Sequence, residues 1–281
     1  MGRLRGNQAI VDEALLGQLT AAAAVAAAAT LAVARAGPSV RIKADQSPVT
    51  DADERSQAIL LQAMARLMPG VAVVSEEADI QPPRLGDVFA LIDPLDGTKE
   101  YVSGSPEYTV NLAIVQDGVP VAGIVAVPAE GLIYRGRAGF GAERLAMSRD
   151  GMIADPAAAQ RIKVRTAPRC IVAAVSRSHL DAATVTLLDR LHIRHRVACG
   201  SALKFCRVAE GLADIYPRLA TTCEWDVAAG HALVAAAGGT VTLPGGEPLQ
   251  YGAAASDFRV PAFIAWGDRT AILDAATALP C

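Results

Sequence analysis

The stretch with the clearest chemical character is Ile92-Asp93-Pro94-Leu95-Asp96-Gly97-Thr98-Lys99-Glu100, which holds two aspartates, a turn and a hydroxyl. The apolar run before it, residues 87–92, is typical of a buried strand, so Asp93 lies where that strand reaches the surface. Proline lacks a backbone N–H, and Pro94 is therefore expected to end regular strand pairing. The stretch is a corner at which a strand gives way to a loop.

The two aspartates at this corner favour a site for a hard cation. Asp93 and Asp96 can share a divalent ion, and the Leu95 carbonyl between them supplies a third oxygen. The amides of Gly97 and Thr98 are then free to meet a phosphate group. A plain surface turn is the competing interpretation, because Asp-Gly is a common turn pair.

Three other segments present carboxylates in a similar way. Val73–Glu77 is a predicted strand that ends in two acids, and Trp225–Gly230 opens an alanine-rich helix with Asp226 in its first turn. Ser47–Asp53 supplies the last acids, at the start of another predicted helix. Hydrolysis of a phosphate ester by two or more divalent ions needs several carboxylates that converge from separate segments.

These four segments, in this order, resemble the lithium-sensitive, magnesium-dependent phosphatase superfamily that includes inositol monophosphatase and fructose-1,6-bisphosphatase. The resemblance extends from about Lys43 to about Tyr251. It implies an α+β fold of the layered α-β-α-β-α sandwich type, with the active site at the seam between two halves. It also implies two or three Mg²⁺ ions as cofactor.

The second half of the chain resembles one branch of that superfamily, the CysQ-type 3'(2'),5'-bisphosphate nucleotidases. The likeness lies in Ser176–His179, Gly200–Cys206 and Asp214–Arg218, which include a Ser-x-x-Lys and a Tyr-x-Arg pair. Inositol monophosphatases are not expected to carry these pairs. The branch implies a small nucleotide as substrate: adenosine 3',5'-bisphosphate loses its 3'-phosphate to give AMP and phosphate in sulfate assimilation. A second substrate would be 3'-phosphoadenylyl sulfate.

The superfamily resemblance assigns roles to the acidic residues. The implied metal ligands are four carboxylates and one main-chain carbonyl: Glu76, Asp93, Leu95, Asp96 and Asp226. Asp93 would contact both of two ions. Thr98 and Asp53 would form a hydrogen-bonded pair that takes a proton from the attacking water, and Glu77 is a second candidate for that base. Asp51 is expected to be a helix cap rather than a ligand.

Substrate recognition is expected from five side chains of the second half: His179, Ser201, Lys204, Tyr216 and Arg218. Ser201 and Lys204 lie three residues apart at the start of a predicted helix, so both could address the second phosphate. Arg218 offers a fork for phosphate or a plane for the base, and Tyr216 and His179 could flank the adenine or ribose. Lys204 and Arg218 are placed away from the phosphate that is removed. The alternatives are a solvated charge at Lys204 and a helix cap at His179.

Composition narrows the class of protein. The 281 residues carry a net charge of −3, and the basic residues are scattered, which argues against a nucleic-acid polymer as partner. Leu19–Ala36 has the length of a membrane span but is mostly alanine, so we predict a buried helix and no transmembrane segment. Contact with the cytoplasmic side of the inner membrane stays open. Five cysteines without CxxC spacing predict reduced thiols and a cytoplasmic protein.

The order of predicted elements divides the chain into two halves. Residues 1–150 hold two helices, a meander of strands and most of the metal ligands. A loop-rich region, residues 141–160, is the best boundary. Residues 151–281 alternate short strands with helices, which predicts a sheet covered by helices that carries nucleotide recognition and the last metal ligand.

Three other functions compete with the nucleotidase. A haloacid-dehalogenase phosphatase also has an Asp-x-Asp-Gly-Thr corner, but its acids lie two residues apart, whereas Asp93 and Asp96 lie three apart. A broader phosphatase acting on inositol monophosphate or fructose bisphosphate is the main alternative enzyme. A non-catalytic nucleotide sensor usually loses a metal ligand, and here every motif acid is present.

Overall fold

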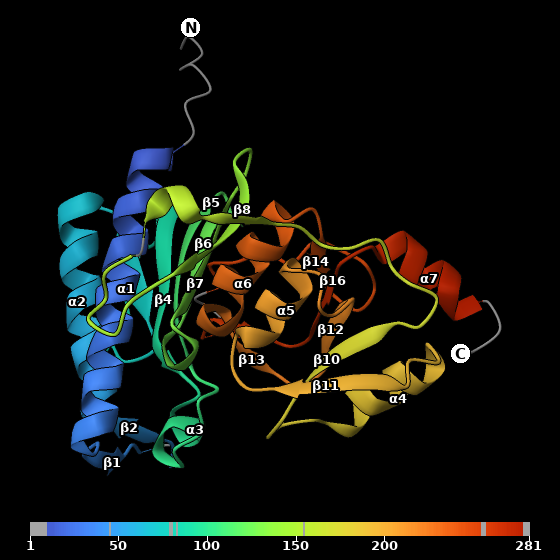
Figure 1. Cartoon of the computed structure of the whole chain (residues 1–281), viewed down its shortest axis with the longest axis horizontal. Coiled ribbons are helices and arrows are strands. Elements are labelled where there is room, and N and C mark those ends of the chain that lie inside the picture. Colours follow the sequence, from blue (N-terminus) through green and yellow to red (C-terminus); the bar gives the residue numbers. More distant parts are fainter. Residues whose placement is uncertain are drawn as a thin grey trace, which may run out of the picture.

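The computed structural model describes residues 10–44, 46–78, 81–82, 84–153, 155–253 and 257–277. Helices and sheets alternate in five layers (Figure 1). Helices α1 (Glu13–Ala36) and α2 (Asp51–Leu67) cover one sheet, and α5 (Leu203–Ala209) and α6 (Glu224–Ala236) fill the space between the two sheets. Helices α4 (Ala182–Arg190) and α7 (Arg269–Thr277) cover the second sheet from outside. The predicted α-β-α-β-α sandwich is confirmed.

The first sheet has seven strands in the order β3-β4-β5-β6-β7-β8-β9. They are β3 (Ala72–Ser75), β4 (Val88–Asp96), β5 (Thr109–Gln116), β6 (Val119–Val127), β7 (Leu132–Arg137), β8 (Gly141–Ala146) and β9 (Gln160–Ile162). β3 and β4 are parallel, and every later pair is antiparallel, so the predicted meander is confirmed. The predicted loop at residues 141–160 is wrong where β8 lies. The proposed division at residue 150 falls between two strands of this one sheet.

Helix α1 is part of the core. It begins after Asp12, whose side chain accepts a hydrogen bond from the Leu15 amide at 2.7 Å. Its small residues let it lie close to α2 and the first sheet, where Leu16 and Leu19 are buried. By length and hydropathy α1 could span a membrane, but over half of its most apolar stretch is buried within the protein. The predicted buried helix is confirmed.

Helix α6 lies against the other face of the first sheet. Gly123 in β6 permits this approach, because a Cβ at that position would overlap the carbonyl oxygen of Ala229 in α6. The helix also contacts β4 and β5 and the second sheet. It therefore joins the two halves of the chain, and Asp226 in its first turn is held between them.

The second sheet has five strands in the order β11-β10-β12-β16-β14. They are β11 (His195–Cys199), β10 (Val172–Ser176), β12 (Ile215–Arg218), β16 (Phe263–Trp266) and β14 (Thr240–Thr242). β10, β11 and β12 are parallel, so their carboxyl ends meet at one edge of the sheet. The predicted sheet covered by helices is confirmed, whereas β16 and α7 were not predicted.

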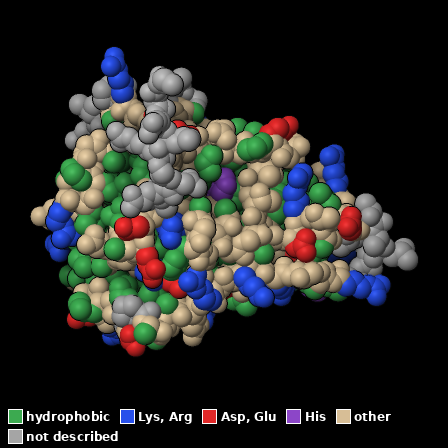
Figure 2. Space-filling model, turned by 90° about the horizontal axis from the view of Figure 1, so that it is seen from above, with side chains coloured by type: hydrophobic (Ala, Val, Ile, Leu, Met, Phe, Trp, Pro, Cys, Tyr) green, Lys and Arg blue, Asp and Glu red, His purple; other side chains and the backbone are tan. Residues whose placement is uncertain are grey.

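The remaining elements are short. β1 (Val40–Ile42) and β2 (Pro48–Thr50) form a hairpin, and β13 (Thr222–Cys223) pairs with β15 (Arg259–Val260). Helix α3 (Thr98–Val102) follows the Asp93–Gly97 corner, and 3₁₀ turns lie at Pro128–Glu130 and Pro156–Ala158. On the face shown in Figure 2, Lys and Arg side chains are spread over the surface.

The cysteines differ in part from the prediction. Cys199, Cys206 and Cys223 are free, and Cys206 is buried in the core as expected. Cys170 is disulfide-bonded, so the prediction of reduced thiols is wrong for this residue. The prediction rested on the absence of closely spaced cysteines, but a disulfide requires proximity in space rather than in sequence. Cys281 lies outside the described residues.

Candidate active site

The acidic corner is a bulge in β4. β4 pairs with β5 through Asp93 opposite Asn111, and pairing resumes at Asp96 opposite Thr109. Pro94 has no N–H for the ladder, and the Leu95 amide donates instead to Asp93 Oδ1 at 3.0 Å. The strand therefore continues to Asp96, and the prediction that it ends at Asp93 is wrong.

Three carboxylates converge on this bulge. Asp93, Asp96 and Asp226 each place one oxygen within 4.8 Å of the others. Asp226 belongs to the first turn of α6, where its Oδ2 accepts from the Cys223 amide at 3.1 Å and from the Thr222 hydroxyl. These hydrogen bonds fix the orientation of the Asp226 carboxylate, and they leave its Oδ1 available to bind a cation.

The cluster suits a divalent cation. Asp93 Oδ2 is buried and has no hydrogen-bond partner among the residues that the structure describes. Burial raises the pKa of Asp93 well above its ordinary value, and the charges of Glu76, Asp96 and Asp226 raise it further. Oxygen ligands of this kind prefer hard cations such as Mg²⁺. A bound cation would satisfy the buried oxygen and relieve the repulsion.

Glu76 lies at the edge of the same cluster, directly after β3. Its amide continues the strand pairing by donating to the Ile92 carbonyl at 3.2 Å. Burial raises the pKa of Glu76, and the charges of Asp226 and Glu77 add to that effect. The structure thus brings all four predicted carboxylate ligands together.

The predicted Thr98–Asp53 pair is present. Thr98 Oγ1 lies 3.2 Å from Asp53 Oδ1 and 3.2 Å from the Leu95 carbonyl oxygen. Asp53 Oδ2 accepts from the Thr50 amide at 2.8 Å and the Thr50 hydroxyl at 2.6 Å. Thr50 is therefore the helix cap, and the prediction that Asp51 caps α2 is wrong because Asp51 accepts from the Ser39 amide instead.

Lys43 is a neighbour that the sequence did not identify. Its Nζ lies 2.5 Å from Glu77 Oε1 and 4.0 Å from Glu76 Oε1. Lys43 follows the β1 strand of a short hairpin, and no pattern in the sequence connects that hairpin to the acids. This ion pair neutralises the Glu77 carboxylate. Glu77 does not line the cavity that lies between the two halves of the chain.

A cavity of about 210 Å³ lies between the two halves. It is lined by every predicted site residue except Asp53 and Glu77: Glu76, Asp93, Leu95, Asp96, Gly97, Thr98, His179, Ser201, Lys204, Tyr216, Arg218 and Asp226. The first six come from the first sheet and its corner. The others come from the carboxyl edge of the second sheet and from the starts of α5 and α6.

Lys204 is buried rather than solvated. Its Nζ donates to the Ser201 carbonyl at 2.6 Å and the Cys199 carbonyl at 3.3 Å, and it lies over the Tyr216 ring. Burial lowers the pKa of Lys204 to about 8, while the charge of Asp96 works in the opposite direction. The alternative of a solvated charge is wrong, because this face of α5 packs against the second sheet.

Arg218 and Ser201 also lie close to the corner. Arg218 Nε is buried without a hydrogen-bond partner among the described residues, and its charge interacts with those of Asp226 and Asp96. Ser201 Oγ lies 2.8 Å from the Asp96 carbonyl oxygen. Lys204 and Arg218 therefore line the same cavity as the carboxylate cluster, and their separation from the phosphate that is removed stays a prediction.

Other residues support the cluster without an evident sequence signal. Thr109 Oγ1 and Asn111 Nδ2 each lie 3.4 Å from Asp96 Oδ2. Both belong to β5 and resemble ordinary strand residues in the sequence. Their role depends on pairing between β4 and β5, which the sequence does not specify.

His179 lies at the cavity, and its amide donates to Ser176 Oγ at 3.1 Å. Helix α4 is capped by Asp181, so the alternative of a helix cap at His179 is wrong.

A layered sandwich with clustered carboxylates and basic side chains at its seam is typical of a class of metal-dependent phosphatases. The chain matches the model of the inositol monophosphatase family over residues 12–270 and belongs to that family. It is 40% identical over 214 residues to the 3'(2'),5'-bisphosphate nucleotidase CysQ of Escherichia coli K12, covering 74% of this chain and 81% of the relative.

Solved structures agree with this assignment. CysQ from Bacteroides thetaiotaomicron, described as a bacterial member of the inositol monophosphatase family, has a TM-score of 0.79 and 32% identity, covering 93% of this chain and 100% of that one. Inositol monophosphatase from Anabaena (Nostoc) sp. PCC 7120 has a TM-score of 0.71 and 25% identity, covering 94% of each chain.

Proposed function

We propose that this enzyme removes the 3'-phosphate of adenosine 3',5'-bisphosphate to give AMP and phosphate. The same proposal places it in sulfate assimilation, with 3'-phosphoadenylyl sulfate as a second substrate. The observation that carries it is that the carboxylate cluster, Lys204 and Arg218 all line one cavity. Its resemblance to the CysQ relatives in sequence and structure supports the nucleotide as substrate.

We assign Mg²⁺ as the cation, in two or three positions. Glu76, Asp93 and the Leu95 carbonyl would hold one ion, and Asp93, Asp96 and Asp226 would hold another. When bound, such ions neutralise the phosphate, lower the pKa of a water molecule and stabilise the leaving oxygen.

The Thr98–Asp53 pair supplies the proton acceptor in this proposal. The Thr98 hydroxyl lies at the cavity and passes a proton to Asp53, which the Thr50 amide and hydroxyl hold in place. Burial raises the pKa of Asp53 and makes it a stronger base. Glu77 is the weaker candidate, because Lys43 neutralises it and it lies away from the cavity.

Positive charge on the opposite wall recognises the substrate. Lys204 and Arg218 would balance the charge of the remaining phosphate, and Arg218 offers a free Nε for a hydrogen bond. Gly97 and Thr98 present their amides to the phosphate that is removed. His179, at the exposed rim, would contact the ribose or adenine.

A cytoplasmic location belongs to the same proposal. Membrane contact is not part of it, because α1 is over half buried against α2 and the first sheet.

A substrate panel tests the proposal. Phosphate release is measured from adenosine 3',5'-bisphosphate, inositol monophosphate and fructose 1,6-bisphosphate, each with Mg²⁺ and with a chelator. We expect turnover only with Mg²⁺ and the highest kcat/KM on the nucleotide. A more than tenfold preference for inositol monophosphate would favour the broader phosphatase, and no release from any compound would favour the non-catalytic sensor.

A further inference from the structure

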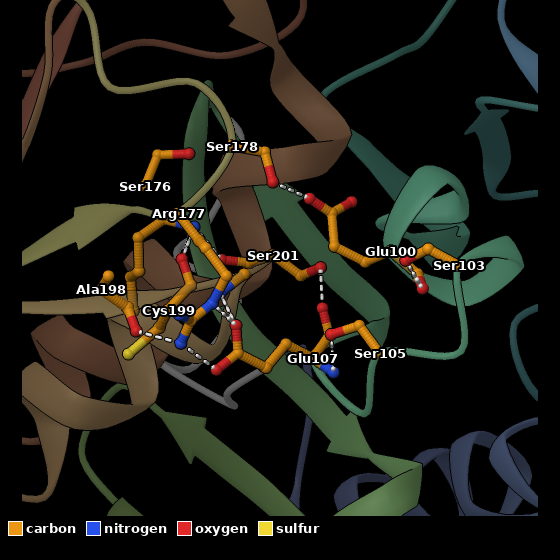
Figure 3. Close-up of polar contacts among 12 residues, drawn as sticks. Glu100, Ser103, Ser105, Glu107, Ser176, Arg177, Ser178, Ala198, Cys199 and Ser201 are labelled. Atoms are coloured by element: carbon orange, nitrogen blue, oxygen red, sulfur yellow. Dashed lines mark hydrogen bonds and ion pairs between the residues drawn. The ribbon is translucent and has the colours of Figure 1, made fainter.

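Glu107 does not line the cavity, but it contacts two segments that do, Ser176–His179 and Gly200–Ser201. Its carboxylate accepts from Arg177 Nε at 2.6 Å, from Arg177 Nη2 at 2.7 Å and from the Gly200 amide at 2.9 Å (Figure 3). Its carbonyl oxygen accepts from Ser201 Oγ at 3.0 Å. Glu107 belongs to the loop between α3 and β5, so these bonds tie the first half of the chain to the second.

The contact between Glu107 and Arg177, which we call the Arg177 arm, holds the segment Ser176–His179 at the cavity. Arg177 Nη2 also donates to the Ala198 carbonyl at 2.7 Å, which holds the guanidinium across the ends of β10 and β11. A second link runs from Ser178 Oγ to the Glu100 carboxylate of α3 (Figure 3). Ser176 and His179 line the cavity on either side of these two contacts.

The contacts of Glu107 with Gly200 and Ser201, which we call the Gly200 arm, lead to Asp96, a predicted metal ligand. Ser201 has a left-handed backbone with φ of 48°, which is strained for a residue with a side chain. Its Oγ bonds to the carbonyls of Asp96 and Glu107 stabilise that conformation. A shift of Glu107 would therefore reach Asp96 through Ser201, whose Oγ contacts the carbonyl oxygens of both residues.

The Glu107–Arg177 pair contributes little to global stability, because the Arg177 side chain is 51% exposed and water screens surface ion pairs. Its geometry is nevertheless bidentate and shared by three segments. Such a contact restricts where the segments lie more than it stabilises the fold.

We propose that Glu107 and Arg177 are positioning residues that hold the Ser176–His179 segment and the Gly200–Ser201 segment in the arrangement that binds the nucleotide. The Arg177 arm sets KM for the nucleotide. The Gly200 arm also supports turnover, through the Ser201 hydroxyl at the Asp96 carbonyl. The inference rests on the proposed nucleotidase function and names residues that act without touching the substrate.

Four variants test it: Arg177→Met, Glu107→Gln, their double variant and Glu107→Ala. Glutamine at 107 can still accept from Gly200, and from Arg177 Nε with the same oxygen, but it loses the negative charge and the bond from Arg177 Nη2. We expect Arg177→Met to raise KM for adenosine 3',5'-bisphosphate about tenfold and Glu107→Gln to raise it by a smaller factor, both with kcat nearly unchanged. The double variant should be no worse than Arg177→Met alone, because both substitutions act on one contact. Glu107→Ala should lower kcat as well.

Arg165→Met is the matched control. Arg165 makes the same bidentate contact with Asp214, at 2.8 Å for each bond, at the amino end of β12, whereas the cavity lies at the carboxyl end of that strand. It should lower the melting temperature at least as much as Arg177→Met and leave KM unchanged. An equal rise of KM in this control would show that lost stability, rather than positioning, causes the effect and would overturn the inference.

Two further results would contradict the proposal that Glu107 and Arg177 hold the two segments in place. If Arg177 contacts the substrate itself, Glu107→Gln would leave KM unchanged while Arg177→Met raises it. If the residues act independently, the double variant would multiply the two effects. Hydrogen exchange of the Gly200 amide gives a readout without substrate: Glu107→Ala should accelerate it and Arg165→Met should not. This measurement keeps the inference testable if the wild-type protein fails to hydrolyse the nucleotide, a result that would contradict only the proposed function.

Discussion

Asp93→Asn should have opposite effects on activity and on the stability of the metal-free protein. Asparagine has the shape of aspartate, and its Oδ1 can keep the 3.0 Å hydrogen bond from the Leu95 amide. Its Nδ2 replaces the buried Oδ2 and cannot bind a cation, but it can donate to the neighbouring carboxylates. The substitution therefore removes a ligand and a repulsive charge without creating a cavity.

The gain in stability follows from the geometry of the cluster. Two charges within 4.8 Å repel by roughly 3 to 4 kcal/mol at an effective dielectric constant of about 20. At pH 7 the gain is limited to about 4 kcal/mol, because a carboxyl with an ordinary pKa of 3.8 can take up a proton at that cost instead. We expect an increase of about 2 to 4 kcal/mol in the free energy of unfolding of the metal-free variant.

Chemical denaturation in a chelator and in saturating Mg²⁺ measures this gain, and phosphate release measures turnover. The variant should gain no stability from Mg²⁺ and should lose at least about a thousandfold in kcat. Asp189→Asn, at an exposed ion pair with Arg196, is the control that should change neither quantity appreciably. A metal-free Asp93→Asn protein less stable than wild type, or one with more than a tenth of wild-type activity, would refute the reasoning.

Three further predictions follow from other contacts. Arg218→Ala and Lys204→Met should each weaken binding of adenosine 3',5'-bisphosphate by roughly 1.5–3 kcal/mol and hardly affect a small phosphate ester; equal losses on both substrates would contradict their role in recognition. Gly97→Ala places a Cβ against Ser201 Oγ at a φ of 92° and should lower kcat more than about tenfold, while Gly104→Ala, with a similar φ of 79° and open space, should not. Burial lowers the pKa of His231 from 6.5 to about 4, so the unfolded chain binds more protons between these values and stability should fall as pH falls through that range; His231→Gln should flatten this part of a denaturation curve against pH, and an unchanged slope would show that the ring does not titrate there.

The carboxylates could be predicted because each stands at a clear change of pattern. Glu76 follows a short apolar strand, Asp93 follows a longer apolar run, and Asp226 lies in the first turn of an alanine-rich helix. The ends of buried strands and the first turns of helices are where polar groups reach a site. Their order along the chain supplied the family resemblance, which in turn implied the layered fold.

The surroundings of Lys204 and the left-handed Ser201 could not be predicted. A spacing of three residues places Ser201 and Lys204 on one side of a helix, but it does not show whether that side meets solvent or the second sheet. The positive φ of Ser201 depends on two carbonyls from the other half of the chain. The residues next to Ser201 in the sequence do not identify these two partners.

The Glu107–Arg177 contact is a second feature outside local reasoning. The two residues lie 70 positions apart, and each stands in a loop without a periodic pattern. Likewise, β4 passes through Pro94 because β5 resumes pairing at Thr109, which a rule about proline alone does not foresee. Contacts between separate segments determine these features, and only the folded chain shows them.

The proposed function requires the enzyme to remove one particular phosphate from a nucleotide. To test this, the purified protein is incubated with adenosine 3',5'-bisphosphate and Mg²⁺, and the products are separated by chromatography. We predict AMP carrying its phosphate at the 5' position, together with one equivalent of inorganic phosphate, and no product when a chelator replaces Mg²⁺. Adenosine 3'-phosphate as the product, or equal product formation in the chelator, would contradict the proposed reaction.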